Sequence, residues 1–175
     1  VVFMVAGIVG APVMAWLATK FGKPRTLMAG AAGFSLGLCT ILFIPRGSVI
    51  AVLPVIFWSG FASSAFQLLV NSMLADVADQ VRLEQGRERL SLIFALNTLV
   101  IKLAAGAAVA IIYPILQLIG YQPAAGAHNS AAAVRGLGLL FVSGPIVFVT
   151  LGAASLIGWK MTAARHAQVR AELDL

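Results

Sequence analysis

A single lysine interrupts the apolar part of this sequence. Lys102 lies near the middle of the run from Leu90 to Ile119, and the other apolar runs of bilayer length contain no charged residue. A lysine at the centre of a membrane-spanning helix costs about 2.5 to 3.5 kcal/mol even on the lenient insertion scale. We therefore expect Lys102 to face a polar cavity or an ion site. The alternative is that its long side chain reaches the interface, or bonds backbone carbonyls and waters.

No acidic residue of the sequence lies at the depth of Lys102. Asp76 and Asp79 stand at the end of the third apolar run, whereas Lys102 lies about 12 residues into the fourth, roughly 18 Å deeper at 1.5 Å per residue. A lysine side chain does not span that distance. A carboxylate partner must then come from sequence outside this chain or from another subunit.

Neutral polar side chains form two sets inside the apolar runs. Ser63, Gln67 and Asn71 are four residues apart, so they share one stripe of a helix. Asn97 and Thr98 lie about one turn before the lysine of the fourth run. Amides and hydroxyls match hydroxyl-rich ligands, and the candidates for lining a sugar-sized cavity are Gln67, Asn71, Asn97 and Thr98. The same residue types also join helices in membranes, and the sequence leaves both interpretations open.

Charged residues are concentrated in the segment that follows the third run. Asp76 and Asp79 are three residues apart and share a helix face. Gly86 permits a turn that would bring Arg87 and Arg89 back toward these acids. We interpret the four charged residues as an ionic latch that forms when one side of the protein closes and breaks when it opens. The alternative is a solvated loop that stabilises the helix end only weakly.

The sequence does not support other kinds of chemistry. His128 and His166 are too far apart in the expected topology to share a site, so we expect both on the surface. No phosphate-binding loop, nucleophile elbow or haem motif is present. We therefore expect no enzyme, no cofactor and no bound metal. The net charge is +6, but the basic residues flank apolar runs and form no continuous cationic face, so we expect no nucleic-acid partner.

The elements that position these residues are long apolar runs. The chain is 61% hydrophobic and 10% charged, so most of its surface must face the lipid bilayer. We predict an all-α integral membrane protein with five transmembrane helices and a polar tail at 160–175. The predicted spans are residues 1–18, 26–45, 48–75, 90–119 and 136–159. Five helices fit the last five of a six-helix unit, and we expect the chain to be part of something longer.

The basic residues predict how these helices are oriented. Short cytoplasmic loops retain lysine and arginine. One side of the predicted topology carries nine basic residues, whereas the other carries only Arg46 and Arg135. The nine are Lys20, Lys23, Arg25, Arg82, Arg87, Arg89, Lys160, Arg165 and Arg170. We therefore expect the C-terminus to be cytoplasmic.

Several short segments together indicate a family. They are MLADVAD at 73–79 with the Gly86-Arg87 pair after it, NTLVIKL at 97–103, IGYQP at 119–123 and KFGKPR at 20–25. This set resembles the C-terminal half of the glycoside-pentoside-hexuronide:cation symporters, the melibiose-permease-like branch of the major facilitator superfamily. The first segment resembles the family's acidic pair at the end of helix ten, and the second resembles its helix-eleven pattern ending in lysine.

The resemblance implies a fold and a function. The five spans would be helices 8–12 of a twelve-helix fold whose N-terminal half is missing here. The protein would be a secondary transporter of a bacterial inner membrane that moves a sugar or glycoside together with Na+ or H+. Lys102 would balance charge at the cation site, and the predicted gate residues would close the cytoplasmic side. Those residues are Asp76, Asp79, Arg87 and Arg89.

Two alternatives remain at the level of the sequence. One is a proton-coupled exporter of drugs or metabolites from the same superfamily. The other is a membrane subunit that does not transport, in which Lys102 pairs with an acid of a partner protein.

Overall fold

The described part of the chain is helical throughout. The structure is a computed structural model that describes residues 1–45, 48–124 and 126–173, and these residues contain no strand. Arg46 and Asp174, which belong to the predicted outer loop and tail, lie outside the described residues. The helices are α1 Val2–Phe21, α2 Lys23–Ile41, α3 Val49–Gln85, α4 Leu90–Leu118, α5 Ala131–Ala154 and α6 Ala163–Leu173.

The predicted all-α membrane fold is confirmed. Four helices, α1, α3, α4 and α5, are long and apolar enough to cross a membrane. The remaining predicted span, residues 26–45, corresponds to α2, which has 19 residues and begins at Lys23. Two basic residues in its first turns and four glycine or serine residues in its body make α2 less apolar than the other four helices.

Two of the helix ends that differ from the apolar runs are set by local backbone chemistry. α3 continues past residue 75 to Gln85 and ends at Gly86, which has φ 63 and closes the helix in the left-handed conformation. The acidic pair therefore lies on a helix rather than in a loop. α5 begins at Ala131, ahead of residue 136, because the Ser130 side chain accepts a hydrogen bond from the Ala133 amide.

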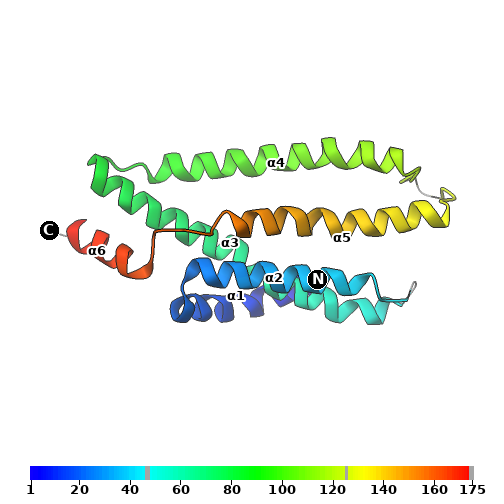
Figure 1. Ribbon diagram of the computed structural model, residues 1–175, viewed down its shortest axis with the longest axis horizontal. Helices are drawn as coiled ribbons and strands as arrows, with labels where there is room; N and C mark the ends of the chain where they lie inside the picture. Colours follow the sequence, from blue (N-terminus) through cyan, green and yellow to red (C-terminus); the bar gives the residue numbers. More distant parts are fainter. Residues whose placement is uncertain (46–47, 125, 174–175) are drawn as a thin grey trace.

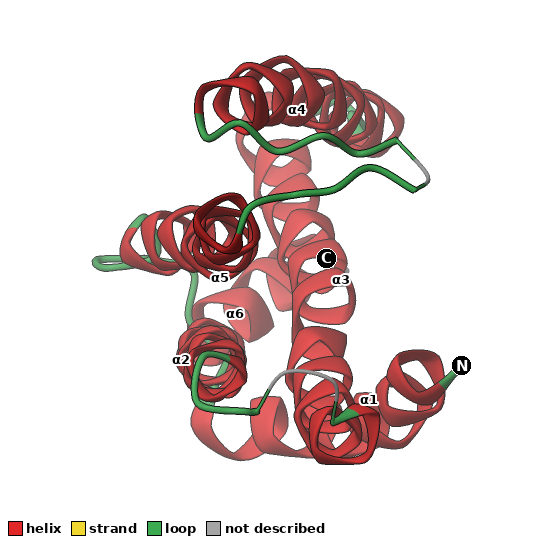
Figure 2. Cartoon of the chain, turned by 90° about the vertical axis from the view of Figure 1, so that its right-hand side faces the viewer, coloured by secondary structure: helices red, strands yellow, loops and turns green. Residues whose placement is uncertain are grey.

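α1, α2 and α3 form the packed part of the structure. Their buried side chains meet in one apolar cluster made of Met14, Leu27, Ala65, Leu69 and Met73. α5 packs on α2, whereas the main contact of α4 is with α3. Figures 1 and 2 show α4 and α1 at opposite edges, with α3 running obliquely between them. α4 has a single buried residue, Leu116, so most of its surface is open.

Glycines allow α1 and α3 to cross at backbone contact. A Cβ atom at Gly10 would lie 2.6 Å from the Phe61 carbonyl oxygen, and a Cβ atom at Gly60 would overlap the Phe3 carbonyl oxygen. Backbone atoms cannot rotate away as a flexible side chain can. Helices in membranes associate through such small residues because lipid gives no hydrophobic drive between them.

Gly60→Ala is expected to destabilise the protein. The added methyl group pushes α1 away from α3, at a cost of about 1 to 3 kcal/mol for overpacking. The melting temperature of the full-length protein in detergent measures this loss. Gly152→Ala is the matched control, since a Cβ atom there has no neighbour within 4 Å. Equal melting temperatures for the two variants would show that the α1–α3 contact is not tight.

Candidate functional site

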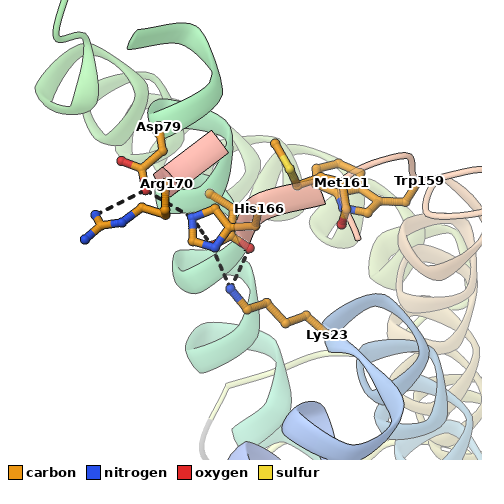
Figure 3. Close-up of polar contacts among 7 residues, drawn as sticks. Lys23, Asp79, Trp159, Met161, His166 and Arg170 are labelled. Atoms are coloured by element: carbon orange, nitrogen blue, oxygen red, sulfur yellow. Dashed lines mark hydrogen bonds and ion pairs between the residues drawn. The ribbon is translucent and has the colours of Figure 1, made fainter. Parts of the chain in front are cut away.

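The acidic pair of α3 is held against basic side chains from two other helices. Lys23 Nζ lies 2.7 Å from Asp76 Oδ1 and 2.5 Å from Asp76 Oδ2. His166 Nε2 lies 3.0 Å from Asp79 Oδ2 and 3.5 Å from Asp76 Oδ1. Arg170 Nη1 lies 3.7 Å from Asp79 Oδ2. We refer to these five residues as the charged cluster, and Figure 3 shows its contacts.

Local geometry brings the five side chains together. Asp76 and Asp79 face the same side of α3, and His166 and Arg170, four residues apart, face the same side of α6. Lys23 is the first residue of α2, placed there by the turn at Gly22, which has φ 90. The charged cluster therefore joins the end of α3 to the start of α2 and to α6.

Burial is strongest at Asp76. Its side chain is 10% exposed, whereas the side chain of Lys23 is 31% exposed and that of Arg170 is 59% exposed. A buried carboxylate is costly unless it is paired and hydrogen bonded. Lys23 satisfies both oxygens of Asp76, so this pair is the centre of the charged cluster. Arg170 is at the rim, where an ion pair contributes little.

The structure does not bring Arg87 and Arg89 to the acidic pair. Both are exposed, and neither forms an ion pair within the described residues. The reason is the extra length of α3. The helix runs six residues beyond Asp79 to Gln85, about 9 Å along its axis at 1.5 Å per residue, and Arg87 follows only after the turn at Gly86. The predicted latch acids thus have different basic partners from those expected.

Sequence reasoning missed three members of the charged cluster. The sequence places Lys23 between two apolar runs and Arg170 in the polar tail, and it links neither residue to the acidic pair. His166 had been expected on the surface, yet its side chain is 27% exposed and contacts both acids. One signal was available: His166 and Arg170 have the i, i+4 spacing of a helix face.

Lys102 and the four candidates for lining a cavity lie on α3 and α4, mostly at exposed positions. Lys102 is exposed on α4 and has no ion pair within the described residues. Gln67 and Thr98 are also exposed, while Asn71 and Asn97 are partly buried. The Thr98 hydroxyl donates to the Phe94 carbonyl, 2.9 Å away in its own helix.

A cavity of about 1140 Å³ lies beside the charged cluster. It is lined by the α1–α2 turn, by α3 and by the segment between α5 and α6, and it includes Lys23, Asp76 and His166. The indole nitrogen of Trp159 donates to the Met161 carbonyl at 3.0 Å and thereby shapes that segment. No group of three metal-ligating side chains is close enough to hold a metal ion among the residues described.

The comparisons with known proteins agree with the helical membrane architecture. Residues 1–163 match the family described as MFS/sugar transport protein. The chain belongs to this family. It therefore belongs to a transporter family of the major facilitator superfamily, and its apolar helices have the architecture of a multi-pass membrane protein.

One relative is a lipid transporter by name. The chain is 28% identical to the sphingosine-1-phosphate transporter MFSD2B of Xenopus tropicalis over 175 residues, which are 98% of this chain and 33% of that protein. The chain thus spans about a third of the length of this relative.

Lys23→Met is expected to destabilise the full-length MFS protein by about 1 to 3 kcal/mol, because it leaves the buried carboxylate of Asp76 without its cation. Adding Asp76→Asn to Lys23→Met should restore part of that loss, since no buried charge remains. Thermal unfolding of the four proteins of this double-mutant cycle measures the coupling. Lys160→Met is the control, because Lys160 is exposed. Additive losses in the cycle would contradict a direct pair.

Proposed function

We propose that the protein is a cation-coupled symporter of a sugar or glycoside that works by alternating access, and that the charged cluster holds its cytoplasmic side closed. The observation that carries this proposal is the Lys23–Asp76 pair, which ties the start of α2 to the end of α3. Alternating access requires contacts at one side of the membrane that form in one state and break in the other. Ion pairs between helix ends are suited to this role.

The excess of basic residues supports a cytoplasmic position for the charged cluster. Lys23 and Arg170 both belong to the side that carries nine basic residues. The cavity of about 1140 Å³ beside the charged cluster would then open toward the cytoplasm. Water and ions on that side could reach the acids as soon as the ion pairs separate.

Lys102 supports the coupling part of the proposal. It is a cation on the open surface of α4, in the middle of a membrane-spanning helix. Ionisable residues at that depth generally face a polar pathway or a partner charge. In this proposal, acids from the rest of the transporter form the cation site, and Lys102 balances their charge.

A second candidate is transport of an amphiphile with an anionic headgroup. The relative named as a sphingosine-1-phosphate transporter favours it. α4 also presents exposed leucine and isoleucine side chains on both sides of Lys102, which could accompany an acyl chain while the lysine meets a phosphate. The two candidates differ in whether the protein takes up a sugar or a lipid.

Lys102→Ala is expected to reduce cation-driven accumulation of the substrate at least tenfold, because the charge balance of the coupling site is lost. The measurement is uptake of a panel of radiolabelled sugars and of sphingosine-1-phosphate into vesicles that contain the full-length protein, with and without a Na+ or proton gradient. Lys160→Ala is the control for loss of a lysine. Normal gradient-driven accumulation by Lys102→Ala would refute this role, and uptake of lipid but not sugar would favour the second candidate.

Replacing both Asp76 and Asp79 by Asn is expected to shift the resting protein toward the cytoplasm-open state, since the contacts that hold α2 and α6 to α3 lose their charge. Labelling of single cysteines along the cytoplasmic pathway by a membrane-impermeant reagent should rise severalfold in inside-out vesicles. Arg87→Gln with Arg89→Gln is the matched control, because these exposed arginines are not in the charged cluster. Equal labelling of all three proteins would contradict the gate.

A further inference from the structure

α6 is attached to α3 by few contacts. Val169 is fully buried and is the apolar anchor of the helix. Among the described residues, the polar contacts that α6 makes with α3 are those of His166 and Arg170 with the acidic pair. Because Arg170 lies 3.7 Å from its partner and is 59% exposed, its contribution is small. His166 is therefore the main polar attachment of α6.

The contacts of His166 depend on its protonation. Both use the same atom, Nε2, and both partners are carboxylate oxygens that only accept. A neutral imidazole has one N–H and can offer one hydrogen to the two carboxylates. A protonated imidazole offers the same hydrogen with a full positive charge next to both acids. The carboxylates are charged in both cases, so protonation adds the electrostatic attraction between a positive imidazole and two anions in a partly buried place.

The other charges around His166 do not remove this dependence. Lys23, from α2, is bound to both oxygens of Asp76 and so competes for that acid. Arg170, from α6 itself, is the other cation near Asp79 and is at the rim. Lys20 and Arg25 line the same cavity, but neither forms an ion pair with the two acids. Asp79 therefore has His166 as its nearest basic partner.

We propose that His166 makes α6 a proton-dependent clamp on the charged cluster: a protonated His166 docks α6 on α3, and its deprotonation releases α6. Histidine is the side chain whose charge changes most readily near neutral pH, so a change of pH is the stimulus to which this clamp would respond. The sign follows from the charges. Docking is favoured at low pH, where His166 is positive, and weakens as the pH rises. The effect of the clamp on the gate rests on the proposed function. The pH-dependent docking of α6 on α3 does not.

The test compares two cysteine positions on α6 in the full-length protein, in a background without other cysteines. Val169→Cys reports release, because this position is buried against α3, and Gln168→Cys is an exposed reference on the same helix. The ratio of their labelling rates with an impermeant maleimide cancels the pH dependence of the thiol reaction. From about pH 5.5 to about pH 8, we expect this ratio to rise about three- to tenfold.

Variants of the two histidines show whether the pH dependence of the labelling ratio comes from His166. His166→Gln keeps a hydrogen-bond donor but never gains a charge, so its ratio should be high and independent of pH. His166→Arg is always charged, and its ratio should stay low. His128→Gln removes the other histidine of this chain and should keep the full response. A flat ratio in the parent protein, or a response that persists in both His166 variants, would overturn the clamp.

The outcomes separate this inference from the proposed function. If the labelling ratio responds to pH as expected but no sugar is accumulated, the proposed function fails and the clamp stands. If the ratio is flat while Asp76→Asn with Asp79→Asn still opens the cytoplasmic pathway, the clamp fails and the gate stands. His166→Arg also keeps the result interpretable if Val169→Cys by itself loosens α6, since a permanent charge should then lower the ratio relative to His166→Gln.

Discussion

The described structure depends on the need of one buried carboxylate for a cation. Asp76 lies on α3, where the helix meets α2 and α6, and its side chain is 10% exposed. Leaving such a group unpaired costs several times more than an ordinary surface contact returns. Lys23 meets that need, and in doing so it fixes the turn between α1 and α2 against α3. The position of α6 follows, because its basic face completes the contacts of the neighbouring Asp79.

The sequence predicted most of the helices but few of their contacts. Apolar runs of bilayer length are a strong signal, and they located five helices that the structure contains. The ends of α3 and α5 were missed by several residues, because the left-handed Gly86 and the Ser130 cap act on the backbone and not on hydropathy. The acidic pair was also recognised, because two acids at helical spacing beside an apolar run are unusual.

The partners of that pair could not be predicted from spacing. Lys23 is 53 positions from Asp76, and His166 is 87 positions from Asp79. Such pairs are set by how α2 and α6 pack on α3, which no local pattern encodes. Arg87 and Arg89 were chosen because they are near in sequence, and the continued helix carries them away. Lys102 is the opposite case: its depth was read from the sequence alone, and the origin of its acidic partner stays a prediction.

The length of α3 determines how far its end would move if the helix tilted at its contact with α1. α3 has 37 residues, which is about 55 Å of helix, whereas the hydrocarbon core of a bilayer is about 30 Å thick. α1 touches α3 at Gly60, and this contact would be the fulcrum if α3 tilted. Asp76 lies 16 residues away, about 24 Å along the helix axis. A tilt of about 10° at this fulcrum would displace the acid by roughly 4 Å over that arm. That displacement would exceed the distances within the ion pairs, so a small rocking motion of α3 relative to its neighbours would be enough to separate the charged cluster.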